Sequence, residues 1–362
     1  MATSPSHLGV LQIEPTDHCN LACRMCAPHA ERWETVHGVP KGLLDPAAFQ
    51  RILDALVAED CRFDHVILQW LGDPSVHPGL EDLVAAAGRT LRGRVDYLRF
   101  DTNALLLTPE RMARLVARRA PDVPLLVVFT LDAATPETYE RVKGRDGLVR
   151  ARRHIRALLA ARAAMPPPHN LHVQVQFVVQ PGNAHEAGEF LRYWTDALSC
   201  HGAGRGHAEI LFKRLSVGGG AAGQAEADRL YDEAMARFGI VPVEGDSLSV
   251  RVWAERPWQR DDAHAGPAVR SACPGLWYTP VVRHDAHLLM CCADLRGELD
   301  LGSLADASFR TLWEGDKATR ARLAHLAGRF DGVCAGCGGI NWYALRPEDA
   351  AAARARGAAL GF

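Results

Sequence analysis

The stretch Cys19-Asn20-Leu21-Ala22-Cys23-Arg24-Met25-Cys26 follows an apolar segment, Val10 to Ile13, and places three cysteines in a C-x3-C-x2-C pattern. This spacing suits three irons of a [4Fe–4S] cube and leaves the fourth iron without a protein ligand. A cluster that is ligated by protein at every iron mostly transfers electrons, whereas an open iron can bind and activate a small molecule. The pattern therefore predicts an enzyme.

Length and composition set the broad class. At 362 residues the chain is long enough to bury a large core. Its 41 Lys and Arg residues nearly balance its 43 Asp and Glu residues, which indicates no nucleic-acid partner. The first residues lack the pattern of a signal peptide, and no run of about 18 uncharged apolar residues predicts a membrane span. We expect a soluble, cytoplasmic protein without a membrane partner.

The ten cysteines favour metal or cluster ligation over disulfides, because disulfide frameworks are typical of small secreted domains. Cys334 and Cys337 form a second close pair near the other end of the chain, and three further cysteines precede it: Cys273, Cys291 and Cys292. Zinc is the main alternative to an iron–sulfur cluster here, since C-x2-C pairs commonly bind zinc. Zinc fits the first three cysteines poorly because no second close pair stands nearby.

Apolar runs and helical patterns alternate along the first two thirds of the chain. The expected strands are Val10–Ile13, Val66–Trp70, Tyr97–Thr102, Leu125–Leu131, His172–Val179 and Glu209–Leu215. The expected helices are Pro46–Val57, Gly79–Leu91, Pro109–Arg118, Gly147–Ala163 and Ala184–Leu198. Asp45, Thr108 and Thr135 each precede a proline and predict helix starts. The alternation implies parallel βαβ units, either in a doubly wound sheet or in a barrel or partial barrel.

The regular alternation of predicted strands and helices ends at Ser216. A glycine-rich junction, residues 218–223, precedes a helix expected over Glu226–Phe238. A stretch rich in Trp, Arg and Asp follows, from Val252 to Asp262, and then a cysteine-bearing module. We expect the tail, Pro347 to Ala359, to form a surface helix.

Residues 8–215 resemble the core of a radical S-adenosylmethionine (SAM) enzyme. The resemblance implies an α/β fold in which the three cysteines follow the first strand of a partial (β/α)6 TIM-like barrel. It implies that SAM chelates the open iron of a [4Fe–4S] cluster, and that one electron cleaves SAM into methionine and a 5′-deoxyadenosyl radical. A flavodoxin- or ferredoxin-type donor is the expected source of that electron.

Segments after the second and third strands also resemble the family. Leu71-Gly72-Asp73-Pro74 is similar to its G-G-E-P segment, which implies that Gly72 and Asp73 lie at the SAM amino group. Thr102 and Asn103 resemble the start of its T-N-G segment, with Ala104 in place of the glycine.

The strongest match follows the fourth strand. The run Thr130-Leu131-Asp132-Ala133-Ala134-Thr135-Pro136-Glu137-Thr138-Tyr139 is similar to the family's S-L-D-A-x-T-P-E-T-Y. The resemblance implies that Thr130 and Asp132 approach the SAM ribose, and that Lys143 or Arg145 pairs with the SAM carboxylate.

Three further positions follow from the resemblance. Met25 stands where the family often has an aromatic residue on the adenine, a space that a thioether can fill. Asn183 and Glu186 resemble an N-x-x-E segment of relatives, and they equally suit a helix cap with an acid in the first turn.

The C-terminal module resembles a twitch domain, the short form of the SPASM auxiliary-cluster domain. This implies a second [4Fe–4S] cluster with four cysteine ligands: Cys273, Cys291, Cys334 and Cys337. The alternatives are a zinc site and buried inert thiols. Spacing in relatives favours Cys291 over Cys292 as the ligand, which leaves Cys292 as a spare thiol. The expected domains are the barrel over 8–215, a connection over 216–272, a small α+β twitch domain over 273–345 and a tail over 346–362.

The layout with one auxiliary cluster resembles that of the 2-deoxy-scyllo-inosamine dehydrogenase type. This implies oxidation of a secondary alcohol in a small polar substrate, such as a cyclitol or an aminoglycoside-type sugar, with the auxiliary cluster as electron acceptor. The alternatives are epimerisation of a sugar or peptide carbon with Cys292 as hydrogen donor, and peptide modification. A non-catalytic iron–sulfur or zinc scaffold is disfavoured by the SAM-site matches. Six residues are candidates for substrate contact or for a solvated linker: Trp253, Glu255, Arg256, Trp258, Asp261 and Asp262.

Overall fold

A ten-stranded sheet with the order β12-β11-β10-β1-β4-β5-β6-β7-β8-β9 forms the centre of the molecule. The structure is a computed structural model that describes residues 7–30, 32–36, 38–166, 170–202, 208–216, 221–245, 248–252, 271–337, 339 and 343–362. Neighbouring strands from β1 to β9 pair in parallel. They are β1 (His7–Ile13), β4 (Arg62–Ile67), β5 (Val95–Thr102), β6 (Leu125–Thr130), β7 (Leu171–Val179), β8 (Ala208–Arg214) and β9 (Leu248–Val252).

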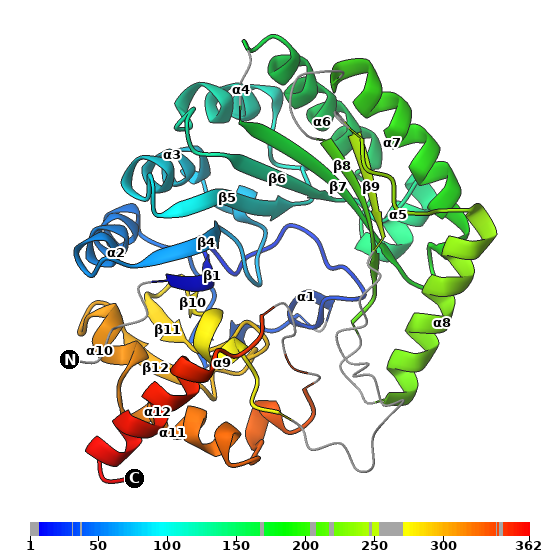
Figure 1. The fold of residues 1–362 in the computed structure, drawn as a ribbon. Helices are drawn as coiled ribbons and strands as arrows, with labels where there is room; N and C mark the ends of the chain where they lie inside the picture. The colour runs from blue at the N-terminus through cyan, green and yellow to red at the C-terminus, as the bar shows by residue number, and fades with distance from the viewer. Residues whose placement is uncertain are drawn as a thin grey trace.

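Helices cover the outer face of this curved sheet (Figure 1). They are α2 (Pro46–Ala58), α3 (Leu80–Thr90), α4 (Pro109–Arg118), α5 (Pro136–Lys143), α6 (Leu148–Ala163), α7 (Ala187–Gly202) and α8 (Ala221–Phe238). A doubly wound sheet would carry helices on both faces. The one-sided arrangement is a partial (β/α) barrel, which confirms the expected α/β fold class.

Three residues expected to cap helices do so. The side chains of Asp45, Thr108 and Thr135 each accept a hydrogen bond from the backbone N–H three residues later. Each is followed by a proline at the first helical position, where the missing N–H costs nothing. These local signals position α2, α4 and α5 against the strands that precede them.

The two faces of each strand differ in chemistry. Phe177 and Phe212 of neighbouring strands point outward and pack against Phe190 of α7, with ring centroids 4.8 and 6.0 Å apart. Gln174 and Gln176 of β7 point into the barrel and line its lumen. Because successive strand residues point to opposite faces, the same strands build an apolar core outside and a polar lumen inside.

The second barrel strand begins earlier than the sequence predicts. We expected Val66–Trp70, whereas β4 spans Arg62–Ile67 and the chain from Leu68 onward continues into a loop. Inward-facing polar residues such as His65 interrupt the apolar pattern of this strand. The apolar run in the sequence therefore straddles the end of the strand.

The sheet continues beyond β8 into the segment expected to connect the barrel and the cysteine module. Helix α8 packs against β7 and β8, and β9 pairs in parallel with β8. The strand is short, and Arg251 interrupts its apolar residues, so periodicity alone did not indicate it.

The C-terminal module continues the same sheet from the other side of β1. Strand β10 (Val281–Val282) is parallel to β1, and β11 (His287–Leu289) and β12 (Asp300–Ser303) follow in antiparallel order. The remaining elements are α9 (Gly275–Tyr278), α10 (Phe309–Trp313), α11 (Asp316–Leu326), a 3₁₀ turn, η4 (Gly332–Cys334), and α12 (Pro347–Ala359). Helix α12 confirms the expected tail helix and packs on α11. Within the described ranges, no helix has the length and apolarity needed to cross a membrane.

Glu59, at the C-terminal end of α2, caps a helix of the module. Its two carboxylate oxygens accept the N–H groups of Phe309 at 3.1 Å and of Arg310 at 2.7 Å. These are first-turn donors of α10, which have no partner within the helix. The carboxylate therefore joins the barrel to the module.

We expect Glu59→Ala to lower the free energy of unfolding by about 1 kcal/mol, the usual cost of a lost helix cap. Thermal unfolding of anaerobically reconstituted protein measures the effect, with Glu226→Ala on the exposed face of α8 as the control. Glu59→Gln should recover part of the loss because its amide oxygen still accepts. Equal midpoints for Glu59→Ala and the control would contradict this role.

Candidate functional site

The three N-terminal cysteines lie in the loop between β1 and the short helix α1 (Ala27–Ala30). The Cys26 N–H donates to the Cys23 carbonyl at 3.0 Å, which closes the second half of the loop. The N–H groups of Ala22 and Arg24 donate to the last carbonyls of α5, at 3.3 and 3.1 Å. The loop is thereby held over the C-terminal ends of the strands, where barrel enzymes have their active sites.

The protein environment keeps these thiols protonated when they bind nothing. Burial raises the pKa of Cys19 to about 12 and also raises those of Cys23 and Cys26. The thiolate is the form that binds a metal, so iron would have to displace the protons. In the described part of the chain, no three His, Cys, Asp or Glu side chains converge as ligands of a single metal ion. A cubane does not require such convergence, since each cysteine binds its own iron.

The segment after β4 crosses the cysteine loop at very short range. A Cβ atom at Gly72 would lie 2.1 Å from the carbonyl oxygen of Thr16 and 2.6 Å from that of His18. The next residue, Asp73, donates its N–H to the His18 carbonyl at 2.9 Å. Only glycine fits this backbone crossing. Gly72 therefore stands beside the cysteine loop for a steric reason.

Asp73, Thr102 and Asn103, three of the residues expected at SAM, lie together. Oδ1 of Asp73 accepts from the Ser75 N–H and the Thr102 hydroxyl, both at 2.9 Å, and Oδ2 accepts from the Asn103 N–H at 2.7 Å. The Asn103 amide donates to Asn20 Oδ1 at 2.9 Å. The buried Asp73 carboxylate thus joins the ends of β4 and β5 to the cysteine loop.

Two non-glycine residues beside the site have left-handed backbones. Ala104 has a φ of +68°, at the position where the family has glycine, and Asp132 has a φ of +57°. Such conformations cost about 1–2 kcal/mol for a residue with a Cβ atom. The Val178 N–H donates to Asp132 Oδ1 at 2.7 Å, and the Asn183 amide donates to the Asp132 carbonyl at 2.8 Å. Strain of this kind concentrates at functional sites.

Asp132 and Lys143, expected to contact different parts of SAM, contact each other. Lys143 Nζ lies 2.5 Å from Asp132 Oδ2, and the two residues are 1% and 0% exposed. Burial alone would lower the pKa of Lys143, but the Asp132 carboxylate raises it above its usual value. Thr130, half-buried, ends β6 just before this pair. Each charge of the buried pair is compensated by the other, in a place that water does not reach.

Met25 lies within the cysteine loop, and Gln180 and Arg145 contact the loop from other segments. The Gln180 amide lies 3.6 Å from Met25 Sδ, and the exposed Arg145 donates to the Asn20 carbonyl at 3.3 Å. Gln180 directly follows β7 and has no pattern in the sequence that would mark it. Gln180 could therefore not be predicted from the sequence.

The N-x-x-E pair has structural roles in this chain. Asn183 supports the strained Asp132 backbone. Glu186 accepts from the N–H groups of Ala134 and Thr135 at 2.6 and 3.1 Å, so its carboxylate stabilises the start of α5. Both residues hold the segment that carries Asp132.

Three titratable residues next to the cysteine loop were also not predicted from the sequence: Glu14, Asp17 and His284. Glu14 accepts from the Leu71 N–H at 2.9 Å, and burial raises its pKa to about 7. Asp17 accepts from the Gly42 N–H at 2.8 Å and lies 3.3 Å from Nε2 of His284 in the module. These residues come from distant parts of the chain, so no spacing could have indicated them.

Four cysteines of the module face one small cavity: Cys273, Cys291, Cys334 and Cys337. Asp294 and His325 line the same cavity. The Cys273 N–H donates to His325 Nδ1 at 3.3 Å, and Asp294 accepts from the Leu299 N–H at 2.7 Å. Four thiols around one cavity are a donor set that a [4Fe–4S] cluster could use, since each cysteine would bind its own iron and no described group converges on a single metal ion.

The adjacent residues Cys291 and Cys292 face different cavities. Cys291 lines the four-cysteine cavity, whereas Cys292 lines the lumen of the barrel. The Trp70 indole N–H donates to the Cys292 carbonyl at 2.9 Å and ties this turn to the end of β4. Spacing in relatives favours Cys291 as the cluster ligand, and the position of Cys291 in the four-cysteine cavity favours it as well.

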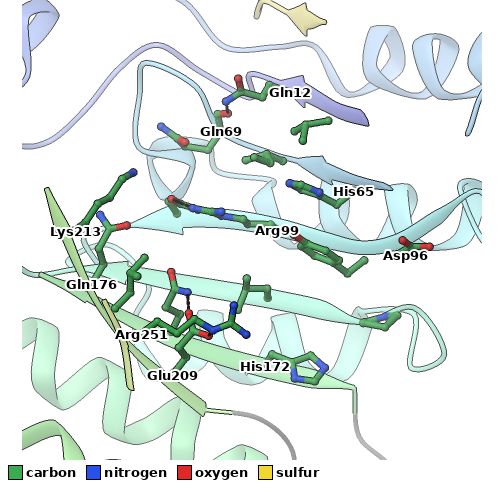
Figure 2. Close-up of a pocket in the computed structure, with 18 of the residues that line it drawn as sticks. Gln12, His65, Gln69, Asp96, Arg99, His172, Gln176, Glu209, Lys213 and Arg251 are labelled. Carbon is green, nitrogen blue, oxygen red and sulfur yellow. Dashed lines mark hydrogen bonds and ion pairs between the residues drawn. The ribbon is translucent and has the colours of Figure 1, made fainter. Parts of the chain in front are cut away.

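The lumen is a cavity of about 1030 Å³ lined mainly by polar side chains (Figure 2). It extends from Lys213 at the cysteine-loop end to Asp96 and His172 at the other end, and Cys292 is among its lining residues. The six candidates for substrate contact between Trp253 and Asp262 lie outside the described residues: Trp253, Glu255, Arg256, Trp258, Asp261 and Asp262.

Stretches of the chain are similar to curated proteins. A stretch of 141 residues is 30% identical to the GTP 3′,8-cyclase of Synechococcus sp. (strain CC9902), and 148 residues are 32% identical to the mycofactocin maturase MftC of Mycobacterium ulcerans. The stretches span 39% and 41% of this chain and 36% of each relative. The chain thus matches about a third of the length of these relatives.

Two solved structures, anSMEcpe and SuiB, share the fold. The structure of anSMEcpe with bound AdoMet matches with a TM-score of 0.56 and 15% identity over 88% of this chain and 81% of that one. Streptococcus suis SuiB bound to S-adenosylmethionine matches with a TM-score of 0.53 and 13% identity over 86% and 66%. BtrN in complex with AdoMet and 2-DOIA matches over 88% and 87% with a TM-score of 0.47 and 13% identity.

Family models cover both cysteine regions. Residues 13–193, half of the chain, match the radical SAM superfamily, and residues 273–338 match the SPASM iron–sulfur cluster-binding domain. The first match contains the cysteine loop and the strained Asp132, and the second contains the four-cysteine cavity. The chain therefore belongs to the radical SAM superfamily, whose cofactors are SAM and a [4Fe–4S] cluster, and carries a C-terminal SPASM-type iron–sulfur domain.

Proposed function

We propose that this radical SAM enzyme is an oxidoreductase that converts a secondary alcohol of a small polyhydroxylated substrate, such as a cyclitol or aminoglycoside-type sugar, to a ketone. One observation carries the proposal: Cys291 lines the four-cysteine cavity and its neighbour Cys292 lines the lumen. Consecutive Cα atoms lie about 3.8 Å apart. A substrate in the lumen would therefore stand next to the auxiliary cluster.

The residues divide into two cofactor sites. Cys19, Cys23 and Cys26 bind the first [4Fe–4S] cluster, and Cys273, Cys291, Cys334 and Cys337 bind the second. The SAM site comprises Met25, Gly72, Asp73, Thr102, Asn103, Thr130, Asp132, Lys143 and Arg145. Because Asp73 and Asp132 are already bonded within the protein, they act by shaping the loops around SAM.

The proposed oxidation removes two electrons and two protons from the alcohol. When bound, the cofactors supply a 5′-deoxyadenosyl radical, which takes one hydrogen atom from the carbinol carbon, and an auxiliary cluster, which accepts one electron. The alcohol also loses its hydroxyl proton, which completes a two-electron oxidation. We propose Asp101 as the acceptor of that proton, because its carboxylate lines the lumen, where Arg99 holds it through two contacts of 2.7 Å. A flavodoxin- or ferredoxin-type protein is the expected external donor.

Epimerisation is the second candidate, and the position of Cys292 in the lumen favours it. After hydrogen abstraction from one face of a carbon, the thiol would return a hydrogen atom to the other face. The resulting thiyl radical would need one electron and one proton, with the external donor supplying the electron through the auxiliary cluster. Cys292 is the catalytic residue in this alternative.

Peptide modification is the third candidate. A similar curated protein is a maturase, and solved neighbours include SuiB bound to precursor peptide SuiA and anSMEcpe with a bound peptide. The lumen of this chain is lined by charged and amide side chains beside apolar ones, and the charged groups favour a substrate that carries polar groups.

We expect two clusters in the reconstituted protein, with about eight irons per chain. Replacing Cys19, Cys23 and Cys26 with Ala should leave one cluster and abolish 5′-deoxyadenosine formation. Replacing Cys334 and Cys337 should leave the other cluster and stop ketone formation. Iron and sulfide analysis with EPR measures this, and Cys200→Ala on the exposed end of α7 is the control. Zinc in the module, or ketone formation without its cluster, would refute the acceptor role.

Cys292→Ala separates oxidation from epimerisation, because only epimerisation needs this thiol. If the reaction is alcohol oxidation, ketone formation by the Cys292→Ala variant should continue, with both clusters in place. Turnover in D₂O provides the second measurement, since an epimer quenched by a thiol acquires deuterium at the inverted carbon. Loss of product in Cys292→Ala, together with deuterium incorporation by the unmodified enzyme, would favour epimerisation. Cys61→Ala, a buried thiol of the barrel, is the matched control.

A further inference from the structure

A buried acid lines the four-cysteine cavity. Asp294 is 0% exposed and lies in the turn after Cys291, whose carbonyl accepts its N–H at 3.2 Å. Two uncharged donors hold its side chain: Oδ1 accepts from the Glu298 N–H at 3.0 Å, and Oδ2 accepts from the Leu299 N–H at 2.7 Å. Backbone N–H groups stabilise an anion without cancelling its charge. The cavity wall therefore carries a negative charge in addition to the thiols.

Positive charge does not offset this carboxylate at the cavity wall. No lysine or arginine of the described chain lines the cavity. His325 lines it, but its Nδ1 accepts the Cys273 N–H at 3.3 Å. A protonated imidazole has no acceptor nitrogen, so His325 is neutral in this arrangement. The buried Arg322 of α11 donates to two backbone carbonyls instead.

The carboxylate has a direct consequence for electron transfer. Reduction of the expected auxiliary cluster adds one electron to this cavity, and the reduction potential of an iron–sulfur cluster depends on the net charge around it. Charges in a buried site are screened much less than charges at the surface. A fixed anion at the wall therefore disfavours the added electron and lowers the potential.

The cavity lies close to both the lumen and the surface. Cys291 in its wall directly precedes Cys292, which lines the lumen. Cys334 and Cys337, also in its wall, are half-buried, and the two residues between them, 335 and 336, are exposed. An electron that enters from the lumen has a short way out through this loop.

We propose that Asp294 keeps the auxiliary cluster at a low reduction potential, so that the electron taken from the substrate is passed on rather than retained. This rests on the proposed function, in which the auxiliary cluster is the electron acceptor. The alcohol gives one hydrogen atom to the deoxyadenosyl radical, one proton to a base and one electron to the acceptor. A one-electron carrier protein of the flavodoxin or ferredoxin class then takes that electron away. Asp294 acts through its charge and does not touch the substrate.

A redox titration followed by EPR tests the proposal without substrate or turnover. It uses the full chain with Cys19, Cys23 and Cys26 replaced by Ala, so that only the auxiliary cluster reports. Asp294→Asn and Asp294→Ser should raise the midpoint potential, and Asp294→Glu should keep it low because the charge is retained. We expect the ratio of reduced to oxidised cluster at a fixed ambient potential to rise about tenfold, or about 59 mV for one electron.

Two controls separate charge from structure. Asp306→Asn removes an exposed carboxylate of the same module and should leave the potential unchanged, because water screens that charge. In the two-cluster protein, Asp294→Asn should leave the potential of the SAM-site cluster unchanged.

An unchanged or lower potential in both charge-removing variants would overturn the proposal. Failure of both variants to hold a cluster would overturn it as well, because Asp294 would then serve the assembly of the site. Metal analysis of the unmodified protein keeps these results apart from the proposed function, which fails if the module holds no iron–sulfur cluster.

Discussion

Strand β1 is hydrogen-bonded along both of its edges, and the positions of both cysteine groups depend on this. On one edge it pairs with β4 over the register from His7 with Arg62 to Gln12 with Ile67. On the other edge the Gln12 N–H donates to the Pro280 carbonyl at 3.0 Å and the Glu14 N–H to the Val282 carbonyl at 2.8 Å. The cysteine loop leaves the end of this strand. The barrel and the module therefore share one continuous sheet. The two cofactor sites cannot move relative to each other without breaking the pairing of β1.

Much of the barrel could be predicted because its signals are local. Capping residues followed by proline marked the starts of α2, α4 and α5, and apolar runs marked the strands whose outward faces are buried in the core. Strand β4 was displaced because its inward residues are polar, and β9 was not predicted because it is short and lies at the edge of the sheet. A polar lumen weakens the hydrophobic pattern on which strand prediction depends.

The candidate site was partly predictable for a similar reason. Cysteine spacing and the segment around Asp132 stand out in the sequence, so the two cysteine groups and the SAM loops could be proposed. The lumen could not, since Arg99, Gln176 and Lys213 come from three strands and are brought together only by the curvature of the sheet. The supporting bonds of Glu14, Gln180 and Glu186 likewise connect distant segments. Sequence spacing carries no information about such contacts.

Cys291 and Cys292 line different cavities although their side chains interact with each other, and this limits the changes in length that the turn tolerates. The turn is held at one end by the β11 pairing and at the other by the bond from Trp70 to the Cys292 carbonyl. Adding or deleting one residue before the pair would change which thiol lines which cavity. The four-cysteine cavity and the lumen therefore depend on the same turn length. Only changes that preserve this length leave each cavity with the thiol that lines it now.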